Sequence, residues 1–358
     1  MVSGCSRRQG ERAQMPRPAL TRLRATAIAL VVAVAMTGCS ANSPEAGPVR
    51  LRLGYFPNLT HATAILGVED GTFQRALGSN AKLEPSLFVS GPPAITAIMS
   101  DAVDAVFVGP TPAVNAFYKT KGDVKIISGA TSGGAQLVVK DGITSAADLK
   151  GTSIADPALG GAPDIQLRYW LKQHGLRTST SGDGDVHVTP QDNSQIAAAY
   201  ASGAIDGAWV PQPYAAILVS RGAHVLVNER SLWPDGRFTT TNLLVRADFL
   251  KKHPETIVAL LRGLIKETDQ VNADPAQASQ RANAAIAKIN GSGLKDEDLR
   301  AAWADMTFTV DPLLPTIKEY GRRGTDVGVL TGGDLSGLAD LGPLNAALQA
   351  EGKEKIAE

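Results

Sequence analysis

The chain has 358 residues, with 35 lysines and arginines balanced by 35 aspartates and glutamates. Six of the basic residues and one acidic residue precede Cys39, which leaves 29 basic and 34 acidic residues, a net charge of −5, in the rest of the chain. A mildly acidic chain argues against nucleic acid as a partner. Both cysteines, Cys5 and Cys39, fall in the same early segment, which excludes disulfide and thiol chemistry from the remainder.

Residues 1–38 have the layout of a secretory signal peptide. A basic segment with three arginines precedes an uncharged apolar run over 25–35. This run is too short to span a bilayer, as is typical of export signals. Residues 1–14 contain no apolar run, so Met15 is an alternative start. We therefore expect the chain to be exported.

The end of this segment resembles a bacterial lipobox. Small residues precede Cys39, and Met36 stands where a leucine is usual. By this resemblance Cys39 is lipidated and becomes the first mature residue, which anchors the protein to the outer face of the cell membrane. Residues 39–48 are rich in serine, asparagine, proline and glycine, as expected of a flexible tether. The alternative is an ordinary signal peptide with an incidental cysteine.

The body opens on a strand that leads into a helix. Apolar and polar residues alternate over 49–55, as in a half-buried strand. Pro57 stops the strand because it cannot donate to a ladder, and Asn58 or Thr60 can cap the helix that follows. In open α/β sheets ligands bind beyond the carboxyl ends of strands, where free amides of a helix start suit an anion or a polar ligand.

The same order of strand, loop and helix recurs along the chain. We predict further strands over 83–89, 104–108, 125–128, 135–140, 153–156, 186–189, 205–210, 224–227 and 240–245. Helices are predicted to begin within 90–93, 109–112, 163–164, 191–193 and 211–214, whereas 131–134 is predicted to be a loop between two strands. From residue 247 the pattern is mainly helical, with a clear apolar stripe over 255–272. Alternating strands and helices indicate parallel-rich α/β sheets.

About 310 residues beyond the tether are large for one core and fit two lobes. We expect the first part of lobe 1 at 49–134 and lobe 2 at 135–239. A return to lobe 1 with C-terminal helices is expected at 240–330, followed by a tail at 331–358.

Six loops share one composition, in which glycine, proline, serine, threonine or asparagine follows a strand and precedes a helix. They are 57–61, 90–93, 109–112, 160–164, 191–194 and 211–214. A single loop of this kind is weak evidence for a binding site, because glycine and proline occur in the loops of every α/β protein. Three loops precede the expected crossover near Gly134 and three follow it. If each group belongs to one lobe, the helix starts face each other across a binding cleft.

Several stretches resemble the periplasmic-type solute receptors for aliphatic sulfonates, taurine and nitrate, which share a superfamily with thiamine-precursor receptors. These stretches are 53–56, 104–112, 129–138, 148–151, 206–211 and 231–236. The resemblance implies an α/β fold of the type II periplasmic-binding-protein kind, with two lobes that are each a mixed sheet flanked by helices. It also implies a small ligand held between the lobes, two crossovers, and delivery to an ABC permease in the membrane.

The resemblance also implies which residues contact the ligand. They are Thr60, His61, Gly91, Gly109, Pro110, Thr111, Ser132, Gly133, Gly134, Ala162, Asp164, Trp209 and Gln212. Three of them have other interpretations: His61 can pack beside its loop, Trp209 can belong to the core, and Asp164 can cap its helix or bind an amine. Phe56, Tyr55 or Trp209 is expected to supply an apolar wall.

An aliphatic sulfonate is the ligand we expect first, because amides and hydroxyls can satisfy its three oxygens without a fixed cation. Nitrate, another small oxyanion and a neutral pyrimidine precursor are the alternatives. A heteroaromatic ligand predicts two aromatic faces along the cleft. The sequence contains no nucleophile elbow, Walker loop or histidine spacing for a metal. We expect a monomer without enzyme activity, cofactor or metal. Enzymes of pyrimidine-precursor synthesis are the rival class. Those relatives use a cysteine-rich segment in their reaction, and the body of this chain after Cys39 contains no cysteine.

Overall fold

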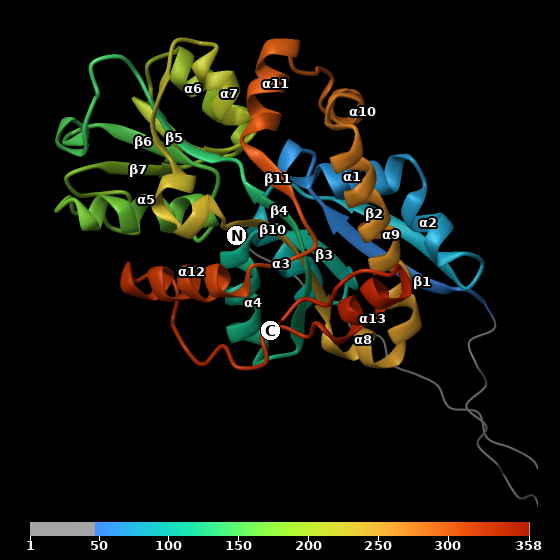
Figure 1. Ribbon diagram of the computed structural model, residues 1–358. Coiled ribbons are helices and arrows are strands. Elements are labelled where there is room, and N and C mark those ends of the chain that lie inside the picture. The colour runs from blue at the N-terminus through green and yellow to red at the C-terminus, as the bar shows by residue number, and fades with distance from the viewer. Residues whose placement is uncertain (1–46, 358) are drawn as a thin grey trace, which may run out of the picture. The chain divides into compact units, whose positions relative to one another are not determined.

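The computed structural model describes residues 47–357, and Gly47–Glu358 forms one compact unit (Figure 1). The predicted signal peptide and the predicted lipidation site at Cys39 lie outside the described residues. Within the described range, every helix is too short or too polar to cross a bilayer.

Within residues 47–357 the first sheet has six strands in the order β11-β4-β10-β3-β1-β2. Their bounds are β1 Val49–Tyr55, β2 Ala81–Leu87, β3 Ala105–Val108, β4 Val124–Gly133, β10 Thr239–Arg246 and β11 Met306–Phe308. β1 pairs in parallel with β2 and β3. β10 runs antiparallel to β3 and β4, and β11 runs antiparallel to β4, so the sheet is mixed.

The second sheet, again counted over the described range, has five strands in the order β7-β6-β8-β5-β9. Their bounds are β5 Ala135–Val139, β6 Ser153–Asp156, β7 His187–Pro190, β8 Gly207–Pro211 and β9 His224–Asn228. β6 pairs in parallel with β7 and β8, whereas β5 is antiparallel to β8 and β9. Leu137 and Val138 of β5 belong to different buried clusters, so both faces of this sheet are covered.

Helices flank both sheets (Figure 1). Their bounds are α1 Ala62–Glu69, α2 Thr72–Leu77, α3 Gly91–Met99, α4 Pro110–Thr120, α5 Ala162–Gln173, α6 Asn193–Ala201, α7 Tyr214–Val219, α8 Ala247–Lys252, α9 Pro254–Ala273, α10 Pro275–Asn290, α11 Asp296–Ala304, α12 Leu314–Asp326 and α13 Gly342–Ala350. Short 3-10 turns cover Leu59–His61, Ala146–Leu149, Glu229–Leu232 and Pro234–Gly236. Proline stands in the first turn of α3, α4, α5, α9, α10, α12 and α13, where its missing N–H costs no hydrogen bond.

The chain passes from the first sheet to the second at Gly134, between β4 and β5, and returns between β9 and β10. The C-terminal helices then contact both lobes, because α12 packs on α4 and α5, and α11 packs on α7. The predicted architecture of two mixed sheets flanked by helices is confirmed. The lobe limits expected at residues 134 and 240 stay predictions.

One local prediction is wrong. Residues 131–134 were expected to form a loop, but β4 continues to Gly133. Its extension pairs with β10 on one side and with β11 on the other. Tertiary pairing therefore overrides the turn-like composition, and the chain turns only at Gly133 and Gly134, whose φ angles are 80° and 79°.

Candidate ligand-binding cleft

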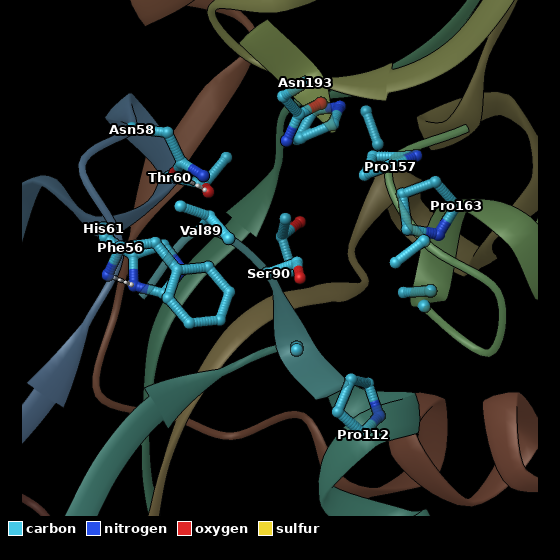
Figure 2. Close-up of a pocket in the computed structure, with 18 of the residues that line it drawn as sticks. Phe56, Asn58, Thr60, His61, Val89, Ser90, Pro112, Pro157, Pro163 and Asn193 are labelled. Carbon is cyan, nitrogen blue, oxygen red and sulfur yellow. Dashed lines mark hydrogen bonds between the residues drawn. The ribbon is translucent and has the colours of Figure 1, made fainter. Parts of the chain in front are cut away.

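A cleft of about 670 Å³, including the part open to solvent, lies where the carboxyl ends of strands from both sheets meet helix starts. Its lining comes from Phe56, Asn58, Thr60, His61, 89–91, Gly109, Pro112, 157–158, 161–163 and Asn193, with Ala135, Pro211, Glu229, Phe238, Thr240 and Tyr320. Each of the six strand–helix loops predicted from sequence supplies at least one of these residues. Figure 2 shows Phe56 and His61 on one side of the cleft and Pro157 and Pro163 on the other.

Helices α3, α4, α5 and α6 begin at this cleft. Their N-cap residues are Ser90, Gly109, Gly161 and Asp192, and no cap side chain accepts a hydrogen bond from the helix. First-turn amides have no partner within a helix, and they carry the positive end of its dipole. Prolines remove several of these donors from α3, α4 and α5. The helix starts therefore provide a field that favours an anion, but only a few N–H groups that can donate to it.

Five of the predicted contact residues line the cleft: Thr60, His61, Gly91, Gly109 and Ala162. The His61 ring is fully buried and stacks on Phe56 with ring centroids 4.4 Å apart. Its Nδ1 accepts a hydrogen bond from the Phe56 amide at 3.3 Å. Burial lowers the pKa of His61 to about 3, so the ring is neutral and contributes an aromatic surface rather than a positive charge.

Three more predicted residues lie where the chain crosses between sheets, and the cleft lining does not include them. The Ser132 hydroxyl accepts a hydrogen bond from the Phe238 amide at 3.3 Å. The carbonyl of Gly134 accepts one from the Gln212 amide at 2.8 Å. At Gly133 an added Cβ would lie 2.3 Å from the Arg230 side chain. These residues shape the crossover behind the cleft.

Pro110 and Thr111 are buried at the start of α4, and the lining again omits them. The Thr111 hydroxyl donates to the carbonyl of Gly160 at 2.9 Å. Because Thr111 precedes the crossover and Gly160 follows it, this hydrogen bond connects the two lobes directly.

Asp164 is buried in the first turn of α5 and does not line the cleft. Its carboxylate accepts hydrogen bonds from the Gly160 amide at 2.8 Å and from Arg168 Nε at 2.5 Å. Burial raises its pKa despite Arg168. These contacts fit the interpretation in which the Asp164 carboxylate caps the start of its own helix.

Trp209 and Gln212 also serve the surrounding structure, and the cleft lining includes neither of them. Trp209 is fully buried, and its Nε1 donates to Glu229 Oε2 at 2.9 Å. Gln212 accepts from the Ala216 amide at 3.2 Å and donates to Asp305 Oδ2 at 3.3 Å. The core interpretation of Trp209 therefore fits its contacts, and Phe56 rather than Tyr55 or Trp209 lines the cleft.

Sequence reasoning missed Glu229, which lines the cleft from a 3-10 turn. One carboxylate oxygen accepts hydrogen bonds from Trp233 Nε1 at 3.2 Å and from the Tyr320 hydroxyl, and the other accepts from Trp209. Burial raises the pKa of Glu229 to about 7, against the lowering effect of these donors. In the sequence, Glu229 is marked only by its position just after the predicted strand over 224–227, between Trp209 and Trp233.

Among the lining residues, all from the described part of the chain, lysine and arginine are absent. Glu229 is the one carboxyl among them, and Tyr320 has its pKa raised well above the usual value by burial. Residues 47–357 also bring together no group of histidine, cysteine, aspartate and glutamate that could hold a metal. The groups that the cleft presents are therefore amides, hydroxyls, aromatic faces and one acid.

The sequence and the fold both match known binding proteins. The NMT1-like family matches residues 44–287. A putative binding protein of Brucella abortus is 26% identical over 298 residues, 82% of this chain and 85% of that protein. The taurine-binding periplasmic protein of Escherichia coli is 30% identical over 207 residues, 58% of this chain and 62% of that protein. A putative aliphatic sulfonates-binding protein of Bacillus subtilis is 28% identical over 248 residues, 65% and 70% of the two chains.

Solved structures share the fold. The alkanesulfonate-binding protein of Xanthomonas axonopodis pv. citri, bound to MOPS, has a TM-score of 0.66 at 19% identity and covers 84% of this chain and 98% of its own. The periplasmic nitrate-binding protein of Synechocystis has a TM-score of 0.68 at 16% identity, with 86% and 90% covered. The predicted resemblance to sulfonate, taurine and nitrate receptors is confirmed.

Proposed function

The chain belongs to the NMT1-like family, and we propose that it is the solute-binding component of an ABC importer that captures a small organic molecule outside the cytoplasm. The observation that carries this proposal is the meeting of six strand–helix loops, from both sheets, in one cleft. Strand ends and helix starts provide a binding surface. The permease is the expected protein partner, and the receptor is expected to be a monomer.

An aliphatic sulfonate is the ligand that we propose first. Four helix starts place their positive ends at the cleft, where a single negative charge is stabilised without a fixed cation. The ring of Phe56 supplies an apolar wall for an alkyl chain. The taurine- and sulfonate-binding relatives support this choice. Nitrate is a less favourable candidate, because it leaves the apolar wall unused.

A neutral heteroaromatic molecule, such as a pyrimidine precursor, is the second candidate. Phe56 and His61 form one aromatic face, and Phe238 and Tyr320 line the cleft as well. Glu229 can accept a hydrogen bond from an amino group and disfavours a nearby anion. These two observations fit a flat ligand that donates hydrogen bonds.

A thermal-shift screen separates these candidates. The purified protein is heated with alkanesulfonates, taurine, nitrate, sulfate or hydroxymethylpyrimidine. A ligand at a hundred times its dissociation constant adds about 2.7 kcal/mol of stability. We expect stabilisation by sulfonates. Stabilisation by the pyrimidine alone would support the receptor function but contradict the sulfonate as its ligand. An absence of any shift would contradict the proposed ligand classes.

We propose that Cys39 carries a lipid anchor, because the segment before it resembles a lipobox. The tether at 39–48 then holds the receptor at the outer face of the membrane, close to the permease. Fractionation of cells checks this: a Cys39→Ser chain should leave the membrane fraction that retains the native chain. Equal retention of both chains would contradict the anchor.

A further inference from the structure

A second chamber adjoins the cleft at one end. The two share four lining residues, Phe56, Asn58, Val89 and Asn193, and Figure 2 shows Asn58 and Asn193 at the same end of the first chamber. The second chamber holds about 1130 Å³, including the space open to solvent, against about 670 Å³ for the first. Its other walls include the apolar side chains of Tyr214, Ile217, Ile286 and Leu294. Together the two chambers offer more volume than a two-carbon ligand fills.

The walls of this second chamber are packed elements of both lobes. Tyr214 and Ile217 lie on α7, which packs on α11. Ile286 lies on α10, and Asn290 at the end of that helix donates a hydrogen bond to the carbonyl of Pro57 at 3.4 Å. Asp305, which ends α11, accepts hydrogen bonds from amide side chains of the second lobe, including Asn228 Nδ2 at 2.9 Å. These contacts fix the positions of the walls.

Asn193 gives an independent indication of a ligand at the junction. Asn193 is 9% exposed, and its Oδ1 has no hydrogen-bond partner in the described structure. Asn58, across the junction, has its Oδ1 occupied by the Thr60 hydroxyl at 2.6 Å. A buried acceptor without a partner is costly, and native proteins rarely leave one. A ligand N–H or O–H at the junction would satisfy it.

We propose that the natural ligand is an extended molecule that occupies both chambers. Its polar head lies at the helix starts of the first chamber, a hydrogen-bond donor lies beside Asn193, and an apolar chain contacts Ile217, Ile286 and Leu294. This inference rests on the receptor function proposed above and specifies the ligand class: a head group with an apolar tail of several carbons, rather than a compact two-carbon sulfonate.

A chain-length series tests the second chamber. Calorimetry measures the binding of ethane-, butane-, hexane- and octanesulfonate to the purified protein. Each methylene that becomes buried is expected to raise the affinity by about fourfold. Ile217→Trp fills the second chamber and should lower the affinity for hexane- and octanesulfonate far more than the affinity for ethanesulfonate. Ile289→Trp is the matched control, because Ile289 is 36% exposed and does not line the chamber.

A second comparison tests the donor beside Asn193. N-butyltaurine and heptanesulfonate have chains of equal length, but only the first carries N–H donors near the middle, on a secondary amine that is protonated at neutral pH. We expect the ratio of their affinities to fall by about three- to tenfold in Asn193→Leu and to be kept or raised in Asn193→Asp, whose carboxylate accepts the same hydrogen bond and also attracts the ammonium charge.

The outcomes separate this inference from the receptor proposal. Binding of ethanesulfonate with no gain for longer chains, or an equal loss for all chains in Ile217→Trp, would overturn the second chamber and leave the receptor intact. An unchanged affinity ratio in Asn193→Leu would overturn the donor position. Failure of every sulfonate to bind would overturn the sulfonate head group and this inference with it.

Discussion

The residue with the most unusual surroundings is Glu229. Its carboxylate is fully buried and receives three donors, from Trp209, Trp233 and Tyr320. Burial nevertheless dominates and raises its pKa from 4.5 to about 7. In the folded protein the acid therefore holds its proton over a range of pH in which the unfolded chain has lost it. Between these two values, the contribution of Glu229 to folding stability falls as the pH rises.

Replacing Glu229 with glutamine should remove this pH dependence. The shift of the Glu229 pKa from 4.5 to about 7 corresponds to about 3 kcal/mol of unfolding free energy. Relative to native protein, Glu229→Gln should gain about that much between pH 4.5 and pH 7 and little above. Urea unfolding at a series of pH values measures the difference.

His61 acts in the opposite direction but does not obscure this test. Burial lowers its pKa from 6.5 to about 3, so it stabilises the fold above pH 6.5, and this contribution is lost as the pH falls toward 3. Because His61 titrates in both proteins, its contribution cancels in the difference. A constant difference between native protein and Glu229→Gln over the whole range would contradict the raised pKa of Glu229.

Single residues were also the hardest to predict from sequence. The resemblance to the receptor family indicated Thr60, His61, Gly91, Gly109 and Ala162, which follow strands or open helices and line the cleft. Glu229 and Asn193 owe their importance to burial and to missing or unusual partners, which depend on distant segments. Trp209 attracted attention as an aromatic residue beside a loop, but its ring is fully buried.

At the scale of elements, boundaries marked by proline and glycine were predicted most accurately. α3, α4 and α5 begin within the loops where prolines were expected to open them. A proline pre-sets the backbone of a first helical turn, so this signal is local. The extension of β4 was missed because its cause is pairing with β10 and β11, which lie far away in sequence. Local composition carries no information about such partners.

Helix α12 connects the lobes through Arg323, which is 8% exposed. Its guanidinium lies 3.9 Å from the centre of the Trp233 ring and donates to Gln166 on α5 at 2.7 Å. Arg323→Met keeps the length of the side chain but removes the cation–π contact and the hydrogen bonds. We expect it to destabilise the fold by about 2 kcal/mol, as measured by equilibrium urea unfolding.

The neighbouring Arg322 provides the control. Its side chain is 55% exposed, pairs on the surface with Glu319, which Arg323 also contacts, and donates to the Tyr169 hydroxyl of α5 at 2.9 Å. A pair of this kind contributes about 0–1 kcal/mol, so Arg322→Met should change stability far less than Arg323→Met. Equal losses of unfolding free energy in the two variants would mean that the buried guanidinium of Arg323 between α12 and α5 adds nothing to the stability of the fold.

For the whole molecule, the central question is how ligand binding couples to the arrangement of the two lobes. The chain crosses between the sheets near Gly134 and again before Thr239, and such crossovers are natural hinges. The hydrogen bond from Thr111 to the carbonyl of Gly160 connects the two lobes outside the cleft lining. If the ligand binds best to the arrangement of the lobes in which this hydrogen bond is formed, the hydrogen bond and the ligand stabilise the same arrangement. The sequence indicated both crossovers, but this contact depends on how the lobes meet.

Thr111→Val tests this coupling, because valine has nearly the same shape and cannot donate the hydrogen bond. We expect the affinity for the ligand found by thermal shift to fall about tenfold, since the lobes must approach without this bond and leave a buried carbonyl unmatched. Calorimetry measures the change. Thr96→Val is the control: Thr96 is exposed and its hydroxyl donates only to Pro92 of its own helix. Native affinity in Thr111→Val would show that the lobes meet around the ligand without help from this contact.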